Sequence, residues 1–195
     1  MKTIFPFLLL LPFYGISQSV SYDDSLNTFV SNYVQAHEVV KGDDKKLLQF
    51  YPVSKTYRVV ATFERKENSE WFLMHTSANT TQQYRVYGIL SFKLNDTLLK
   101  LRLYQSKDLL SSKDYWNYLF LPFTDKTTGI DTYGGGRYID MVIADIHGNN
   151  CVIDFNKAYN PYCAYATGYH CPIPPAENEL SVAVMAGEKS YSKKH

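Results

Sequence analysis

The sequence has no surplus of positive charge. Its 195 residues include 20 Lys and Arg against 19 Asp and Glu, which gives a net charge of +1. A protein that binds nucleic acid is normally basic, because contacts to phosphates dominate its affinity. The basic residues near the C-terminus, Lys189, Lys193 and Lys194, are typical of a short solvated tail. No nucleic-acid partner is therefore expected.

Long apolar runs are also scarce. After residue 19, no stretch approaches the roughly 20 apolar residues that a helix needs to cross a bilayer, so no membrane span is expected. Residues 1–19 combine Lys2, an apolar run and small residues such as Gly15, which is the pattern of a secretory signal peptide. The sequence therefore predicts an exported protein, periplasmic or secreted. Residues 20–195 are expected to form a single β-rich domain with a short C-terminal tail.

One amphipathic helix is predicted near the N-terminus, over residues about 24–40. Asp23 or Asp24 is the expected N-cap, and Gly42 is expected to end the helix. Apolar side chains recur at helical spacing along one face, at Leu26, Phe29, Val30, Tyr33 and Val40. This face is expected to pack on a sheet.

The rest of the chain has the period of two that is typical of strands. Tyr is the most frequent aromatic residue, with 17 copies, and it favours half-buried pleated surfaces. Alternation and turn signals predict strands at 56–64, 84–94, 98–104, 118–123, 138–145, 151–155 and 180–186. Asn95-Asp96-Thr97 is predicted to close one hairpin, and residues 146–150 a second. The expected class is mainly β: an antiparallel β-sandwich or partly closed β-barrel with one N-terminal amphipathic helix.

Three segments of the C-terminal half resemble a known family. They are YLFLPFTDKTTGIDTYGGGRYID at 118–140, IDFNKAYNPYCAY at 153–165 and YHCPIPPAENELSVAVMAGEK at 169–189. In order and spacing they resemble an uncharacterised family of bacterial and archaeal proteins, catalogued as domain of unknown function 1684. The resemblance implies a compact β-rich domain and frequent export, and it supplies no catalytic residue.

The three cysteines leave several possibilities open. Cys163 and Cys171 bracket a short loop, and an exported protein meets an oxidising compartment, so a disulfide between them is predicted. Cys151 lies in a strand pattern and is expected to be buried. Alternatives are a thiol nucleophile with His170 or His147 as its base, or a zinc site, although no short Cys-x-x-Cys spacing is present.

The glycine run before Arg137 predicts a tight turn. Arg137 can clamp a carboxylate or phosphate, or it can pair with a nearby acid such as Asp140 or Asp154. The run is not a phosphate-binding loop, because the Gly-Lys-Ser/Thr ending is missing and a strand follows instead of a helix.

Acidic residues form a further group: Asp140, Asp154, Glu177 and Glu188. Two such carboxylates can act as acid and base, or hold a cation. Asp140 and Asp154 lie on polar faces of two strands that are expected to pair. Carboxylates on polar strand faces are more often solvated.

The long irregular stretch after the strand at 151–155 contains a loop rich in Tyr and Asn. Asn156, Tyr159 and Asn160 begin it, and such side chains suit stacking on, and hydrogen bonding to, a small polar ligand such as a sugar. The same residues also suit a loop packed on a barrel end.

The biochemical function is not determined by these patterns. The favoured hypothesis is an exported small-ligand-binding β domain of the cell envelope, without a cofactor or metal. Its candidate ligand-binding residues are Arg137, Asp140, Asp154, Asn156, Tyr159, Asn160 and Glu177. The alternatives are an envelope hydrolase that uses an acidic or thiol site, and a structural or interaction protein without catalysis.

Overall fold

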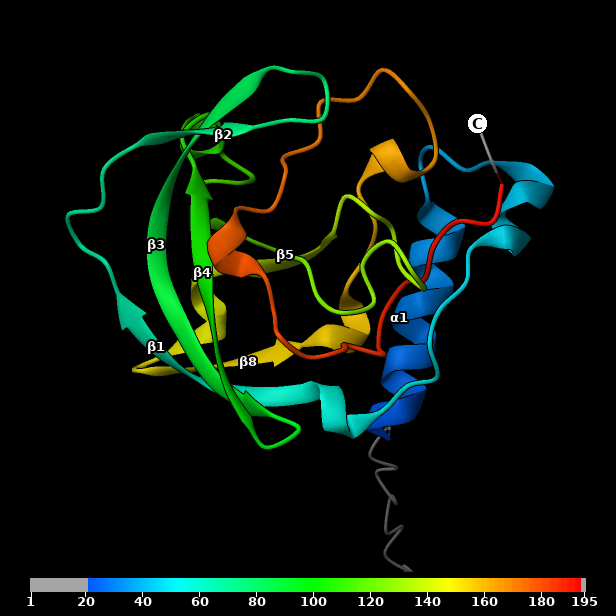
Figure 1. The fold of residues 1–195 in the computed structure, drawn as a ribbon, viewed down its shortest axis with the longest axis horizontal. Helices are drawn as coiled ribbons and strands as arrows, with labels where there is room; N and C mark the ends of the chain where they lie inside the picture. Colours follow the sequence, from blue (N-terminus) through cyan, green and yellow to red (C-terminus); the bar gives the residue numbers. More distant parts are fainter. Residues whose placement is uncertain (1–20, 194–195) are drawn as a thin grey trace, which may run out of the picture.

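The computed structural model describes residues 21–193, and the predicted signal peptide at 1–19 lies outside them. An eight-stranded antiparallel sheet dominates the fold (Figure 1). Its strands are β1 Arg58–Arg65, β2 Phe72–His75, β3 Thr81–Leu94, β4 Thr97–Ser106, β5 Tyr118–Phe123, β6 Arg137–Val142, β7 Ile146–His147 and β8 Asn150–Asp154. The one α-helix in this part of the chain is α1, Tyr22–Ala36.

Short 3-10 helices lie between and after these elements. They are η1 Gly42–Leu47, η2 Lys55–Tyr57, η3 Leu109–Ser111, η4 Ile143–Asp145, η5 Phe155–Lys157, η6 Tyr162–Ala164 and η7 Ala176–Asn178.

The strands follow the order β6-β5-β4-β3-β1-β8-β7, and β2 pairs with β3 off this path. The prediction of a mainly β, antiparallel fold with one helix near the N-terminus is therefore confirmed. No pairing joins β6 to β7 within residues 21–193, so the sheet is not a closed barrel.

The alternation of the sequence places the core on one face of the sheet. In β1, Val59, Ala61 and Phe63 are buried while their neighbours Arg58, Val60, Thr62 and Glu64 are exposed. The same alternation in β4 buries Leu99, Leu101 and Leu103. Side chains of period two point to opposite faces, so each strand contributes one apolar row to the core.

The predicted hairpin at Asn95 is confirmed. Leu94 pairs with Thr97, so the turn has two central residues, Asn95 and Asp96. Their φ angles are 47° and 61°, which matches the type I′ turn that Asn and Asp tolerate. This turn fixes the register of the long β3–β4 pair.

The second predicted hairpin is wrong, because the strands predicted at 138–145 and 151–155 do not pair with each other. β6 pairs with β5, whereas β8 pairs with β1 and with the two-residue strand β7. The tight turn at Gly148 joins β7 to β8, because His147 pairs with Asn150. Asp140 and Asp154 therefore lie on strands that do not pair with each other.

The strand predicted at 180–186 is also absent. Leu180, Val184 and Ala186 are buried, so the apolar alternation is real. The carbonyl groups of Val184 and Ala186, however, accept hydrogen bonds from the buried Arg137 guanidinium instead of from a neighbouring strand. An extended segment whose acceptors are taken by a side chain forms no ladder.

The helix α1 is shorter than predicted at its C-terminal end. Its N-cap is Ser21, and not Asp23 or Asp24 as predicted, since the Ser21 hydroxyl accepts a hydrogen bond of 3.1 Å from the amide of Asp24. At the other end, Nδ1 of His37 accepts a hydrogen bond from the amide of Val40 at 3.0 Å. This bond satisfies an amide outside the helix, so the chain turns away at His37, before Gly42.

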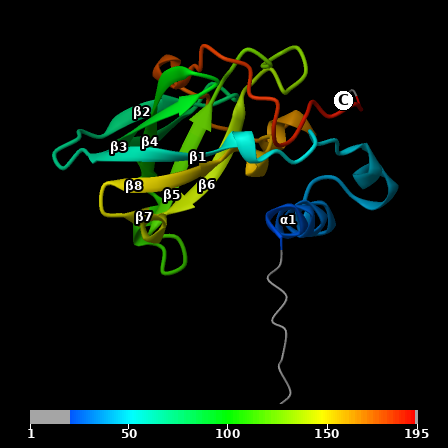
Figure 2. The same ribbon diagram turned by 90° about the horizontal axis from the view of Figure 1, so that it is seen from below.

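The position of α1 also differs from the expectation. Figures 1 and 2 show it to one side of the sheet and not over its broad face. It packs against η5, and the Tyr22 hydroxyl donates to Asp154 at the end of β8 at 3.0 Å. The helix therefore flanks the segment that follows β8.

Among the described residues, no helix is long and apolar enough to cross a membrane.

Candidate functional site

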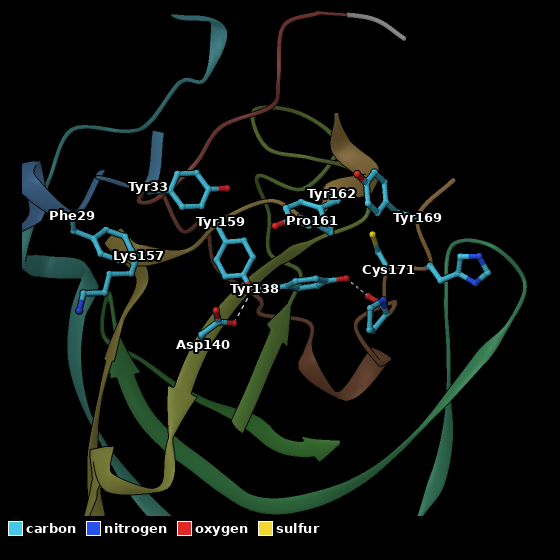
Figure 3. Close-up of a pocket in the computed structure, with 12 residues that line it drawn as sticks. Phe29, Tyr33, Tyr138, Asp140, Lys157, Tyr159, Pro161, Tyr162, Tyr169 and Cys171 are labelled. Atoms are coloured by element: carbon cyan, nitrogen blue, oxygen red, sulfur yellow. Dashed lines mark hydrogen bonds between the residues drawn. The ribbon is translucent and has the colours of Figure 1, made fainter. Parts of the chain in front are cut away.

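A cavity of about 670 Å³, called the main cavity below, lies between α1, β6 and the segment that follows β8 (Figure 3). Its walls are mainly aromatic and include Phe29, Tyr33, Tyr138, Tyr159, Tyr162 and Tyr169. The charged side chains in its lining are Asp140 and Lys157, and His170 lies in the wall as well. A volume between about 300 and 1,000 Å³ is typical of small-molecule sites.

β6 supplies two neighbouring side chains of the cavity. Tyr138 and Asp140 are two residues apart in a strand, so their side chains lie on the same face. The backbone of Tyr159 pairs with that of Tyr138 through reciprocal hydrogen bonds of 2.9 and 3.0 Å. This pairing fixes the Tyr159 ring beside Tyr138, with 5.9 Å between the ring centroids.

Asp140 is held by two tyrosines. The hydroxyl groups of Tyr118 and Tyr159 each donate to the same oxygen, Oδ1 of Asp140, at 2.6 Å. Burial, with the charge of Asp140 adding to it, raises the pKa of Tyr118 well above its ordinary value. Burial likewise raises the pKa of Tyr159, so both hydroxyls remain donors. Within residues 21–193, Oδ2 of Asp140 accepts no hydrogen bond.

Most other tyrosine hydroxyls of the cavity are already bonded to protein groups. The hydroxyl of Tyr138 donates to the Pro172 carbonyl, and that of Tyr162 donates to Glu38 at 3.0 Å. These rings therefore offer aromatic surface to the cavity, while Asp140 and Lys157 supply the charged hydrogen-bonding groups. Lys157 extends over the Phe29 ring, with 5.3 Å from Nζ to the ring centroid.

The predicted disulfide between Cys163 and Cys171 is present and forms part of the cavity wall. The Cα atoms are 6.3 Å apart. The amide of Ser77 donates to the Cys171 carbonyl at 2.9 Å, which joins the disulfide loop to the β2–β3 connection. Cys171 lies beside Tyr169 in the cavity wall (Figure 3).

A buried carboxyl group lies behind the cavity wall. Glu188 has no exposed surface and accepts hydrogen bonds from Tyr165 at 2.7 Å and from Tyr33 at 3.1 Å. The backbone amide of Asn160 donates to it at 2.9 Å. Burial raises the pKa of Glu188 to about 7, although these donors act in the opposite direction. Because Tyr33 also lines the cavity, its hydrogen bond connects the cavity wall to the titratable Glu188 side chain.

Arg137 does not reach the cavity. Its side chain is fully buried, and its guanidinium pairs with Asp125 at 2.8 Å. It also donates to the carbonyl groups of Val184 and Glu188, at 2.9 and 3.3 Å. The partner acid is Asp125, and neither Asp140 nor Asp154 as considered from the sequence. Arg137 therefore braces the C-terminal segment and has no contact with a ligand site.

The glycine before Arg137 is required by close packing. Gly136 has a φ of 83°, and a Cβ there would lie 2.7 Å from the Phe123 carbonyl oxygen. Only glycine permits this approach of the turn to β5.

Asp154 and Asn156 tie α1 to the end of the sheet. Asp154 accepts hydrogen bonds from the Tyr22 hydroxyl and from the Asn156 side chain, each at 3.0 Å. Asn156 also bonds the backbone of Ser54 with both its amide nitrogen and its oxygen, at 2.9 Å each. Asn156 is buried outside the main cavity. Asp154 lines a smaller cavity of about 290 Å³ together with Asp140.

Asn160 and Glu177 also lie away from the main cavity. Asn160 is fully buried, and its amide group donates to the Lys189 carbonyl at 2.8 Å. Glu177 is exposed and pairs with Arg102 at 3.0 Å. Of the seven candidate residues, the structure brings Asp140 and Tyr159 together in the main cavity.

The cavity contains residues that the sequence did not single out as ligand-binding. Phe29 and Tyr33 were recognised as an apolar helix face, and they line the cavity because α1 flanks the segment after β8. Lys157 matches no motif. The sequence feature that could have identified it is its place in the Tyr-rich loop, two residues after the strand predicted at 151–155.

The thiol hypothesis is not supported by the cysteines. Cys163 and Cys171 are joined, and Cys151 is buried. Burial raises the pKa of the Cys151 thiol to about 11, so it stays protonated at neutral pH. Among residues 21–193, no group of three or more His, Cys, Asp or Glu side chains is arranged to hold a metal ion.

The fold and the cavity define an antiparallel β domain with an aromatic, carboxylate-bearing pocket. The chain belongs to the family described as Protein of unknown function (DUF1684), which matches residues 45–189. The family resemblance of the sequence is thereby confirmed.

A solved structure is similar to the chain. It is the solution NMR structure of an uncharacterised protein from Haloarcula marismortui, with 30% sequence identity and a TM-score of 0.65. The match covers 88% of this chain and 97% of that one. No curated protein matches the chain. These relationships carry no assigned activity.

Proposed function

We propose that the protein binds a small, neutral, hydroxyl-rich ligand, with a sugar as the class that fits, in the cavity beside Asp140. The observation that carries the proposal is a carboxylate held at one oxygen by two tyrosines within an aromatic cavity. The apolar C–H face of a sugar ring packs on tyrosine rings, and its hydroxyl groups donate to a carboxylate.

The charges of the cavity favour a neutral ligand. Asp140 and Lys157 both line it, and their formal charges cancel. A singly charged ligand would gain attraction from one and repulsion from the other. A hydroxyl group both donates and accepts, so a polyol can bond both side chains at once.

The proposed setting is the cell envelope, as an exported periplasmic or secreted protein. The Cys163–Cys171 disulfide supports this, since such bonds persist in oxidising compartments. The sequence pattern of residues 1–19 supports it independently.

The test is isothermal titration of a sugar panel into the wild-type protein and the Asp140→Asn variant. A hydrogen bond to a charged group contributes about 1.5–3 kcal/mol, so the variant should lose roughly tenfold or more in affinity. Glu177→Gln is the matched control, because Glu177 is an exposed carboxylate outside the cavity. Equal affinities of wild type and Asp140→Asn would contradict the proposal.

The hydrolase alternative rests on one specific observation. Asp140, Asp145 and Asp154 line the cavity of about 290 Å³, and glycosidases use two carboxylates. Asp145 and Asp154 are already hydrogen-bonded, to the Val142 amide and to the Asn156 side chain. Release of shorter sugars from the panel, lost in Asp140→Asn and in Asp154→Asn, would establish this alternative.

The third alternative is a structural or interaction protein. It would be favoured if native mass spectrometry of the exported protein, purified without reductant, showed a bare polypeptide and no sugar bound at millimolar concentration.

A further inference from the structure

Two cavities meet at Asp140. The main cavity adjoins a second one of about 360 Å³, and the two share four wall residues. The shared residues are Tyr138, Asp140, Tyr159 and Pro172. Asp140 and Tyr159 therefore line both spaces.

The second cavity has its own aromatic walls. They come from β3, from β5 and from the connection before β5, and include Tyr84, Tyr115, Tyr118 and Phe120. Phe120 packs edge-on against Tyr138, with 4.7 Å between the ring centroids. Tyr115 is 55% exposed, which places it at the cavity mouth. Both spaces thus offer the same kind of surface, tyrosine and phenylalanine rings around one carboxylate.

The carboxylate is bonded by side chains of both cavities. Tyr118 lines the second cavity and Tyr159 lines both, and each donates to Oδ1 of Asp140 at 2.6 Å. Two separate ligands would compete for the other oxygen. One ligand with two linked rings can place a single hydroxyl there and a ring in each cavity. Linking the two contacts makes the second one intramolecular, which raises the affinity.

We infer that the ligand is an oligosaccharide, with adjacent sugar units in the two cavities and a hydroxyl group beside their linkage on Asp140. This inference rests on the proposed function and specifies its ligand. Each cavity has a volume of the order that small-molecule sites have, about 300 Å³ or more.

The experiment compares sugars of increasing length by isothermal titration. Two series serve as probes: glucose, maltose and maltotetraose, and N-acetylglucosamine with its β-1,4-linked dimer and tetramer. The protein is exported and purified without reductant. In the series that binds, the dimer and tetramer are expected to bind at least about tenfold more tightly than the single sugar, because linkage of two sites can raise affinity by roughly 10²–10⁴.

Variants test whether the gain in affinity with sugar length comes from the second cavity. Tyr115→Ala removes a wall of the second cavity that the main cavity does not share, so it should abolish the length dependence. Trp116→Ala is the matched control, since Trp116 is equally exposed and lines neither cavity. Tyr169→Ala, in the main cavity, should weaken short and long sugars alike.

The outcomes separate the inference from the proposed function. If single sugars bind and longer ones bind no more tightly, the two-cavity inference is overturned while the proposed function stands. Full oligosaccharide affinity in Tyr115→Ala has the same meaning. If no sugar of either series binds, both are overturned.

Discussion

The region enclosed by the sheet and the region beside α1 both contain buried side chains, but these side chains are of different kinds. The sheet encloses an aliphatic and aromatic cluster whose fully buried members include Leu90, Leu101, Leu103, Leu119 and Ile153. Beside α1, the half-buried Tyr33 is connected by hydrogen bonds to a buried group of polar residues, Tyr165, Asn160 and Glu188. Arg137 lies between these regions, in contact with the C-terminal segment.

The two regions are stabilised in different ways. Apolar burial contributes about 25 cal/mol per Å² and depends on no single partner. A buried polar group stabilises the fold only while its partners stay in place. The main cavity borders the second region through Tyr33, so the candidate site depends on the hydrogen-bonded part of the interior.

The largest effect is expected from Arg137→Met. It leaves the carboxylate of Asp125 buried without its partner, and breaking a buried ion pair costs about 3–5 kcal/mol of unfolding free energy. Urea denaturation measures the loss. Arg102→Met is the control, because its ion pair with Glu177 is exposed and contributes about 1 kcal/mol or less. Similar losses in the two variants would remove the distinction between buried and exposed pairs.

The pH dependence of stability should distinguish the two interiors. The pKa of Glu188 is about 7 in the folded protein and near its ordinary 4.5 when unfolded. Between these values the folded state binds more protons, so the unfolding free energy falls as pH rises. The contribution is on the order of 3 kcal/mol, present below pH 4.5 and lost above pH 7.

The measurement is urea denaturation at several pH values. The difference between wild type and Glu188→Gln should follow this fall, since glutamine does not titrate. Leu101→Ala should lose about 2–5 kcal/mol equally at every pH, because it deletes apolar contacts only. A constant difference between wild type and Glu188→Gln across this range would show that the buried carboxyl does not titrate as expected.

Removal of the disulfide is expected to have a smaller effect. The bond closes a loop with a sequence separation of 8, for which loop-closure entropy gives about 2.5 kcal/mol. The double variant Cys163→Ser, Cys171→Ser should lose this amount in urea denaturation, and so should the reduced wild-type protein. Added reductant should leave the double variant unchanged. A stability of the double variant equal to that of the oxidised wild type would contradict the expectation.

The smallest effect is expected from Tyr118→Phe. It removes one hydroxyl from the exposed carboxylate of Asp140, and water can replace that donor, so the loss should be about 1 kcal/mol or less. Thermal unfolding measures it, with Tyr115→Phe as the control for loss of a hydroxyl without a protein partner among the described residues. A loss above about 2 kcal/mol would show that Asp140 behaves like a buried carboxyl group such as Glu188.

Local patterns were sufficient for much of the fold. Apolar alternation identified β1 and β4, the turn at Asn95-Asp96 identified the hairpin of β3 with β4, and an aromatic run identified β5. They failed at the segment 180–186, where apolar alternation is present but a side chain takes the backbone acceptors. They also missed β2, Phe72–His75, which is short and lies off the main path of the sheet.

The candidate site was only partly predictable, for a physical reason. Asp140, Tyr159 and the disulfide stood out by residue type and spacing, and the structure places all three at the cavity. Arg137, Asn156 and Asn160 have the same polar character, but their partners are buried protein groups. Residue type shows what a side chain can bond, and only its surroundings show which partner it has.

Residue patterns alone were enough to predict the antiparallel β class, the N-terminal helix, the family and the disulfide. Each depends on residue types at short spacing or on segments recognisable as a set. Three features became visible only in the folded chain: β6 and β8 do not pair, α1 flanks the segment after β8, and Asp140 rather than Arg137 faces the cavity. These depend on contacts between residues far apart in the chain, where packing and burial select one partner among several of equal chemistry.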